Sequence, residues 1–247
     1  MNGEALSRLR RAVCSLGYIR IPFEGYLADP TRGRFEIMGT GFLVGPMFVL
    51  TCAHVVAALD LERRKSGERP YGQAAEFGYP DLKAAGEWTT AIRPFEVVHV
   101  DERTDLALLK LTKEVEAEPV AIATEDFIPL VGDPVGLCGY PHGSKLTSRG
   151  GAIDRVGPLV QTGIIAALSP FDTKAPDRIV MDLATGGGAS GSPIFRPEDG
   201  VVIGFLMEGQ IGPYASFSIA RTLFRDSQGR ANARLRTGLE VTKKSVG

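Results

Sequence analysis

The sequence predicts an all-β protein made of two packed six-stranded antiparallel β-barrels, preceded by a short N-terminal helix. From Gly17 onward, brief apolar runs are separated by glycine, proline and aspartate at spacings that suit antiparallel strands and not helices. A stretch at 112–132 divides these runs into two sets of about six. Two similar sets of short strands favour two barrels.

The N-terminal helix is predicted from a helical period. Leu6, Leu9 and Val13 follow one another at i, i+3 and i+7, and arginines occupy the opposite face. The helix is therefore expected over 4–13.

The strands expected in the first set are 19–23, 35–44, 48–51, 74–79, 94–100 and 106–111. One helical turn is expected within 57–65, and 66–88 is expected to be mostly loop because it is charged and rich in glycine. This barrel would span about 14–112.

The strands expected in the second set are 133–139, 145–155, 159–167, 178–183, 201–207 and 214–219. A closing helical turn is expected at 220–225, and the second barrel would span about 130–220. One domain at 1–225 would thus be followed by a polar tail or linker at 226–247, which is basic and contains glycine.

Composition limits the classes of partner. The chain has 247 residues, of which 44% are hydrophobic, and a formal net charge of −1. This is the balance of a soluble globular protein, without the basic footprint of a nucleic-acid binder or the roughly 18 apolar residues of a membrane span. The N-terminal arginines precede no apolar stretch, so no secretion signal is expected.

The three cysteines predict a reducing, cytoplasmic location. Cys14, Cys52 and Cys138 cannot all pair, and none belongs to a Cys-x-x-Cys arrangement. We interpret Cys52 as a small buried hydrophobic residue. The histidines are scattered and no paired cysteines accompany them, so neither a metal nor a cofactor is expected.

A glycine-rich stretch around Ser190 is the strongest chemical signal. Glycines at 186–188 can adopt positive φ and direct successive N–H groups into one small space, as an oxyanion hole requires. Ala189 and Gly191 leave the Ser190 hydroxyl approachable. Alone, such a run more often marks a turn between strands.

Two further stretches favour catalysis. His54 ends an apolar run, and Asp105 opens the run Leu-Ala-Leu-Leu. A serine hydroxyl needs an adjacent base, and the base needs an acceptor that fixes its tautomer. The order His, Asp, Ser is that of chymotrypsin and differs from those of subtilisin and the α/β-hydrolases.

With these residues, the chain resembles the trypsin/chymotrypsin-like serine peptidases, and in particular the bacterial HtrA-like and single-domain branch without a PDZ domain. The matching pieces are 39–44, the blocks around His54, Asp105 and Ser190, 139–141, Asp182 and 202–204. The resemblance implies two barrels with the active site between them. It also implies that the backbone N–H groups of Gly188 and Ser190 bind the oxyanion.

Other candidates are assigned structural roles. His99 is expected in a strand and His142 in a loop, and both are interpreted as structural histidines. Asp101 precedes Asp105 in a predicted turn. Asp182 matches an acidic position of HtrA-like peptidases and is expected to be a buried, hydrogen-bonded carboxylate.

The resemblance also locates the substrate-binding residues. Ala184 would form the base of the primary pocket, so a basic P1 side chain would find no buried counter-charge there. Gly209 would lie at the pocket entrance and Met207 in its wall strand, which favours small or medium apolar P1 residues. Glu208 would line the non-prime subsites and attract basic side chains at P2 to P4.

The predicted function is a serine endopeptidase that cleaves a protein substrate through an acyl-enzyme. By analogy with related bacterial enzymes, it would be a regulated cytoplasmic protease in signalling or defence, controlled by loop ordering or by a protein partner. Ala189 cannot form the ion pair that activates trypsin-like zymogens, so an intact N-terminus should be compatible with activity. The alternatives are a catalytically silent binding module and a small-ester hydrolase.

Overall fold

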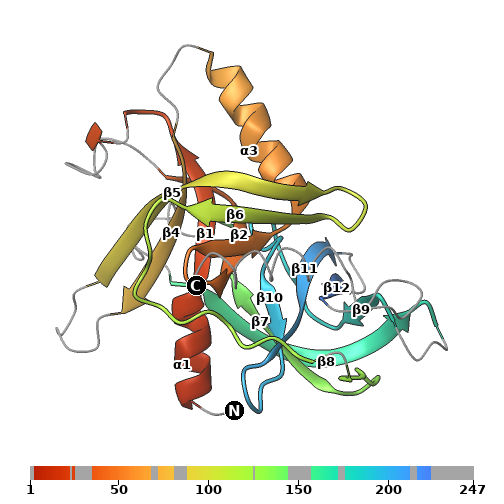
Figure 1. The fold of residues 1–247 in the computed structure, drawn as a ribbon. Coiled ribbons are helices and arrows are strands. Elements are labelled where there is room, and N and C mark those ends of the chain that lie inside the picture. Colours follow the sequence, from red (N-terminus) through yellow and green to blue (C-terminus); the bar gives the residue numbers. More distant parts are fainter. Residues whose placement is uncertain are drawn as a thin grey trace.

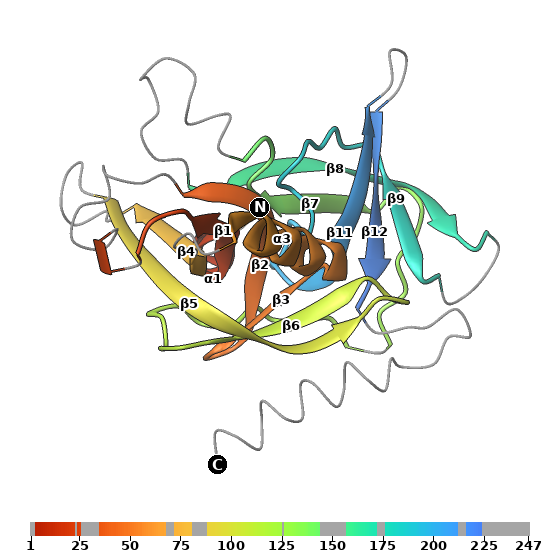
Figure 2. The same ribbon diagram turned by 90° about the horizontal axis from the view of Figure 1, so that it is seen from above.

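The computed structural model describes residues 3–22, 24–25, 35–67, 72–80, 88–124, 126–143, 157–171, 176–211 and 216–223. Within these ranges, twelve strands form two closed antiparallel barrels that lie side by side (Figures 1 and 2). The strand order is β1-β2-β3-β6-β5-β4 in the first barrel and β10-β11-β12-β9-β8-β7 in the second. The predicted fold class is confirmed.

The elements of the first barrel and its helices are α1 (Gly3–Ala12), β1 (Val13–Ile19), β2 (Glu36–Gly45), β3 (Phe48–Thr51), α3 (Ala53–Ser66), β4 (Gly72–Pro80), β5 (Trp88–Asp101) and β6 (Leu106–Leu111). Those of the second barrel are β7 (Pro134–Gly139), β8 (Leu159–Ser169), β9 (Arg178–Met181), β10 (Pro193–Phe195), β11 (Val202–Ile211) and β12 (Ser216–Thr222). The two helices lie at opposite ends of the first barrel (Figure 1).

Two elements of the first barrel differ from the prediction. The first strand is β1 and not 19–23. All seven of its residues are buried, so it lacks the polar-apolar alternation that reveals a half-exposed strand. The helical turn expected within 57–65 is a 14-residue helix, α3, whose second residue is His54.

The second barrel also contains an unpredicted strand. β10 is only three residues long and wholly buried, too short to show a period. A closing helical turn was predicted at 220–225. The prediction is wrong for residues 220–222, which the structure describes as the end of β12. The predicted strand 145–155 and the tail 226–247 both lie entirely outside the described residues.

The barrels are fastened to each other by packing and by the connecting segment. The larger core cluster fills the first barrel and continues into the second through Tyr140, Phe195 and Phe205. Between the barrels, Val120 N donates to a carbonyl of β2, and the segment then makes a short bridge to β11 at Val202. The two barrels are therefore joined both by a shared apolar core and by backbone hydrogen bonds.

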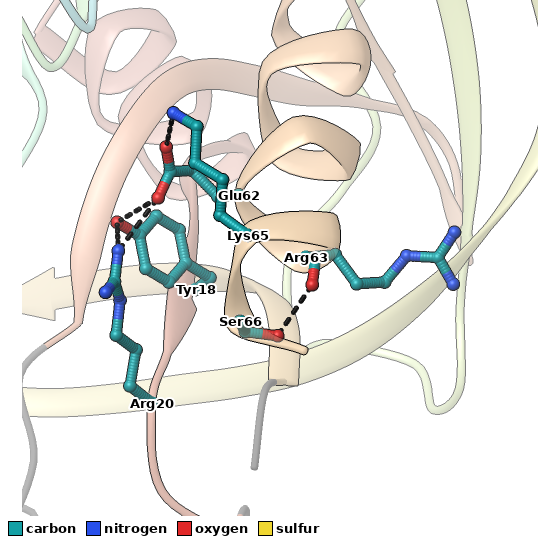
Figure 3. A network of polar contacts seen from close by, with 6 residues as sticks. All are labelled: Tyr18, Arg20, Glu62, Arg63, Lys65 and Ser66. Carbon is teal, nitrogen blue, oxygen red and sulfur yellow. Dashed lines mark hydrogen bonds and ion pairs between the residues drawn. The ribbon is translucent and has the colours of Figure 1, made fainter. Parts of the chain in front are cut away.

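The helix that contains His54 is anchored far from that residue. Near its C-terminal end, Glu62 accepts hydrogen bonds from Tyr18 Oη (3.3 Å) and Arg20 Nη2 (2.8 Å), and Lys65 Nζ lies 2.7 Å from its other carboxylate oxygen (Figure 3). Tyr18 belongs to β1, so the network joins α3 to the barrel wall. Exposed ion pairs of this kind each stabilise a fold by at most about 1 kcal/mol. Among the described residues, no helix is long and apolar enough to cross a membrane.

Candidate active site

His54 and Asp105 meet at the N-terminal end of α3. His54 Nδ1 lies 2.8 Å from Asp105 Oδ2, while Asp105 Oδ1 accepts a hydrogen bond from the His54 backbone N–H at 3.0 Å. The Asp105 carbonyl accepts from Ala53 N–H at 3.1 Å. The first N–H groups of a helix have no partner within the helix, so a residue from another element satisfies them here. One aspartate thus fixes both the ring and the backbone of His54.

Asp105 occupies an unusual backbone position. Its φ is +53°, in the left-handed region, and it ends the turn between β5 and β6. Such a conformation in a residue other than glycine costs about 1–3 kcal/mol and is frequent at functional sites. Burial alone raises the pKa of the Asp105 carboxyl, but the hydrogen bonds from the side chain and backbone of His54 outweigh it and hold the pKa below its usual value. The carboxyl is thus ionised near neutral pH.

Cys52 lies directly behind this pair. Its thiol is fully buried, donates to the Leu206 carbonyl across the barrel interface at 3.1 Å, and adjoins the Asp105 carboxylate. Burial, and secondarily that carboxylate, raise the pKa of the Cys52 thiol. Cys52 is buried as predicted, but it also makes polar contacts that its interpretation as a small hydrophobic residue did not foresee. The sequence signal that could have indicated these contacts is the Cys-x-His spacing, which places Cys52 two residues before His54.

Ser190 belongs to a loop of the second barrel that is attached to the first barrel by Thr40. Thr40 N donates to the Ser190 carbonyl at 2.8 Å, and Thr40 Oγ1 donates to the Gly188 carbonyl at 2.8 Å. The same hydroxyl accepts from Tyr140 N at 3.1 Å. Gly191 has φ +86°, and a Cβ there would lie 2.1 Å from the Thr40 carbonyl oxygen. Only glycine therefore permits this approach.

The loop leaves several N–H groups available. Those of Ala189, Gly191 and Ser192 donate to backbone carbonyls, whereas within the described ranges those of glycines 186–188 and of Ser190 have no acceptor. Of the three glycines, which the sequence allowed positive φ, only Gly188 adopts it, at +94°. The free donors include those of Gly188 and Ser190, the residues expected to form the oxyanion hole.

The Ser190 hydroxyl is directed to a carbonyl. Ser190 Oγ donates to Met207 O at 3.2 Å, and the described part of the chain shows no hydrogen bond between it and His54. Both residues nevertheless line one open cavity of about 700 Å³. The structure thus places all three triad candidates in the lining of one cavity.

The cavity includes most of the predicted substrate-binding residues. Its full lining is His54, Asp105, Arg178, Thr185, Gly186, Gly187, Ser190, Leu206, Met207, Glu208 and Gly209. Ala184 is not among them: its side chain is exposed, and its carbonyl accepts from Gln161 Nε2 at 3.0 Å. The next residue, Thr185, faces inward in its place. Sequence reasoning also missed Arg178, for which no motif gave a signal.

Thr185 is a buried residue of the cavity lining. Its hydroxyl lies 2.9 Å from Ser218 Oγ, which itself donates to the Leu183 carbonyl. A Cβ at Gly209 would lie 2.0 Å from Thr185 Oγ1, so the two walls nearly touch there. Thr185 and Gly209 therefore adjoin each other in the cavity wall, and both are uncharged.

The remaining candidates lie outside the cavity lining. Asp101 is buried, and its Oδ1 accepts from Arg103 N at 3.1 Å within the β5–β6 turn. Asp182 was expected to be buried but is exposed; its Oδ1 still accepts from Ile164 N at 2.7 Å. His142 is exposed, has φ +65°, and packs its ring against Gly186. These contacts fit structural roles.

Comparisons with known proteins agree with this geometry. Residues 39–205, about two thirds of the chain, match the family of trypsin-like peptidase domains. The chain is 25% identical over 199 residues to the peroxisomal leader peptide-processing protease of Mus musculus, a match covering 76% of this chain and 30% of that protein.

Two bacterial proteins also match. One is a probable periplasmic serine endoprotease, DegP-like, of Marinomonas, with 28% identity over 74% of this chain and 32% of that protein. The other is a glutamyl endopeptidase of Staphylococcus epidermidis, with 24% identity over 72% of this chain and 56% of that protein. The chain thus spans less than two thirds of the length of each of these relatives.

Proposed function

The chain belongs to the family of trypsin-like peptidases, and on that premise we propose that it is a serine endopeptidase acting through an acyl-enzyme. The observation that supports this most directly is the 2.8 Å contact between His54 Nδ1 and Asp105 Oδ2 in a cavity that Ser190 also lines. A hydroxyl, an imidazole and an ionised carboxylate in one cleft are the parts that nucleophilic catalysis by serine requires.

In the proposed mechanism, His54 is the general base. The Asp105 carboxylate accepts a hydrogen bond from Nδ1–H, which keeps the proton on Nδ1 and leaves the Nε2 lone pair to take the Ser190 proton during attack on the scissile carbonyl. The Ser190 hydroxyl must first leave Met207 O, and rotation of one side-chain bond is the change this needs. His54 later returns the proton to the leaving amine, and water then releases the acyl group.

The oxyanion would be bound by the N–H groups of Gly188 and Ser190. They have no acceptor in the described structure, and Thr40 and Leu206 hold the loop on either side of them. Donors that are already fixed before the reaction need no reorganisation when charge develops on the substrate oxygen, and each is worth about 10²–10³ in kcat.

The proposed substrates are proteins with a small or medium apolar residue at P1. Of the two carboxylates in the cavity lining, that of Asp105 is bound to His54 and that of Glu208 is exposed, so neither provides a buried counter-charge for a lysine or arginine at P1. Toward the rim, Glu208 and Arg178 both line the cavity and present opposite charges to the neighbouring subsites. The attraction of Glu208 for basic side chains at P2 to P4 would therefore be tempered by Arg178.

The proposal is tested with a fluorophosphonate probe and a peptide library. Wild-type protein should be labelled at Ser190 and should cleave peptides, whereas Ser190→Ala should lose labelling and at least about 10⁴-fold in kcat. The substitution removes one oxygen, so urea unfolding of the two proteins should be closely similar. A folded wild-type protein that is neither labelled nor active would contradict the proposal.

The alternative function is a catalytically silent binding module. The observation that favours it is the hydrogen bond of Ser190 Oγ to Met207 O, because a silent module needs no contact between Ser190 and His54. Failure of fluorophosphonate labelling, with peptide binding retained, would select this alternative.

We further propose that the enzyme is a regulated cytoplasmic protease of bacterial signalling or defence, controlled by a protein partner. All three cysteines are free and buried in the structure, which suits a reducing compartment. Relatives named as periplasmic and peroxisomal make cell fractionation the decisive test of the compartment.

A further inference from the structure

Three potential metal-binding side chains converge at the centre of the proposed site. The ligand atoms of Cys52, His54 and Asp105 all lie within 4.8 Å of one another. They come from two elements, because Cys52 and His54 flank the start of α3 and Asp105 ends the β5–β6 turn. We propose that Cys52 Sγ, His54 Nδ1 and Asp105 Oδ2 form an inhibitory binding site for a thiophilic divalent cation of the Zn²⁺ and Cd²⁺ class.

The donor set suits such a cation. Thiolate, imidazole and carboxylate are its usual protein ligands, at about 2.0–2.3 Å from the metal, which separates neighbouring ligand atoms by about 3.5 Å in a tetrahedral site. Nδ1 and Oδ2 lie 2.8 Å apart, so they need to separate only slightly. A cation of charge +2 also balances the thiolate and carboxylate, which would repel each other without it.

Access is provided from the cavity side. The His54 side chain is 49% exposed and that of Asp105 19%, whereas Cys52 is fully buried behind them. A cation would therefore enter past the His54 ring. On binding, the thiol releases its proton to solvent and the hydrogen bond between Nδ1 and Oδ2 is replaced by two bonds to the metal, with no change of oxidation state.

Coordination at Nδ1 determines the effect on catalysis. A neutral imidazole bound through one nitrogen has its proton on the other nitrogen. The proton of His54 would then lie on Nε2, the atom that must accept the Ser190 proton. The inhibition, though not the binding, depends on the function proposed above.

Cation binding is tested first in Ser190→Ala protein. This variant lacks the proposed nucleophile, so binding is measured independently of catalysis. After treatment with a chelator, Cd²⁺ is added and the ultraviolet sulfur-to-cadmium charge-transfer absorption is followed. We expect one Cd²⁺ per chain, loss of the absorption when Cys52→Ala or Cys52→Ser is added, and retention with Cys138→Ala. Cys52→Ser retains a hydroxyl donor for Leu206 O, so it guards against loss of fold, and circular dichroism checks each variant.

His54→Ala in the same background should weaken Cd²⁺ binding at least about 10-fold, since loss of even an outer-shell partner has that effect. In active protein, Zn²⁺ should abolish hydrolysis, a chelator should restore it, and Cys52→Ala should require at least about 10-fold more Zn²⁺. Absorption that is absent from Ser190→Ala protein, persists without Cys52 or is indifferent to His54 would overturn the cation site. Protein that binds Cd²⁺ as expected but never cleaves a peptide would overturn only the proposed function.

Discussion

Thr40→Val tests whether the first barrel positions the oxyanion loop. Valine has nearly the shape of threonine, but it leaves two groups without a partner: the partly buried Gly188 carbonyl, 2.8 Å from Thr40 Oγ1, and the buried Tyr140 N–H, 3.1 Å from it. An unsatisfied buried polar group costs about 1–3 kcal/mol and a partly buried one costs less, so the free energy of unfolding should fall by about 1–4 kcal/mol. Release of the Gly188 carbonyl should also disturb its N–H and lower kcat by about 10²–10³.

The matched control is Thr40→Ser, which retains the hydroxyl and loses one methyl group, at a cost of about 1 kcal/mol. Stability is measured by urea unfolding with the m-value compared between variants, and activity by the rate of fluorophosphonate labelling. If Thr40→Val matched Thr40→Ser in both stability and labelling rate, the hydroxyl would not position the loop, and the reasoning would be refuted.

Two further predictions concern pH and specificity. Because the folded-state pKa of Asp105 lies below its unfolded value, its stabilising contribution is present above about pH 4 and is lost as pH falls through the folded pKa. The difference in unfolding free energy between wild type and Asp105→Asn should therefore be constant above about pH 5 and shrink as pH falls below about 4; a difference that stays constant down to about pH 3 in urea titrations would contradict this. Among peptides that differ only at P1, Ala or Val should be cleaved at least about 10-fold faster than Lys or Arg, because the inner cavity would desolvate an unpaired charge. Thr185→Gly should improve cleavage after Leu relative to Ala, and a preference for Arg in wild-type protein would refute the assignment of the pocket.

The pattern of apolar runs and the turn residues between them were sufficient to predict the fold class but not every strand. Strands such as β2, β3 and β8 were found close to their true bounds, although β3 is wholly buried. β1 was predicted too late in the chain, and β10 was missed because three residues show no period. The length of α3 was underestimated, since its N-terminal residues are stabilised by Asp105, which lies 51 residues away in the sequence.

The sequence was sufficient to predict which residues form the proposed site, but not which contacts they make. Spacing and order identified His54, Asp105 and Ser190, and the structure brings them to one cavity. Counting from Ser190 chose Ala184 for the pocket, whereas the direction of each side chain depends on local backbone geometry, which makes Thr185 the inward residue. The hydrogen bonds of Thr40 and Cys52 cross between barrels, and no pattern within one chain segment contains that information.

The irregularity in β11 explains how one strand can serve both halves of the site. The pairing of β11 with β12 shifts register between Leu206 and Glu208, so Met207 is the extra residue of a β-bulge. A bulge redirects the groups that flank it. The Leu206 carbonyl accepts from Gly191 N at 2.8 Å and from Cys52 Sγ at 3.1 Å, and the Met207 carbonyl accepts from Ser190 Oγ at 3.2 Å. In a regular strand, successive carbonyls point in opposite directions and these two could not both serve the site. The bulge therefore connects the nucleophile loop to the segment that begins α3, and the relative position of Ser190 and His54 depends on it.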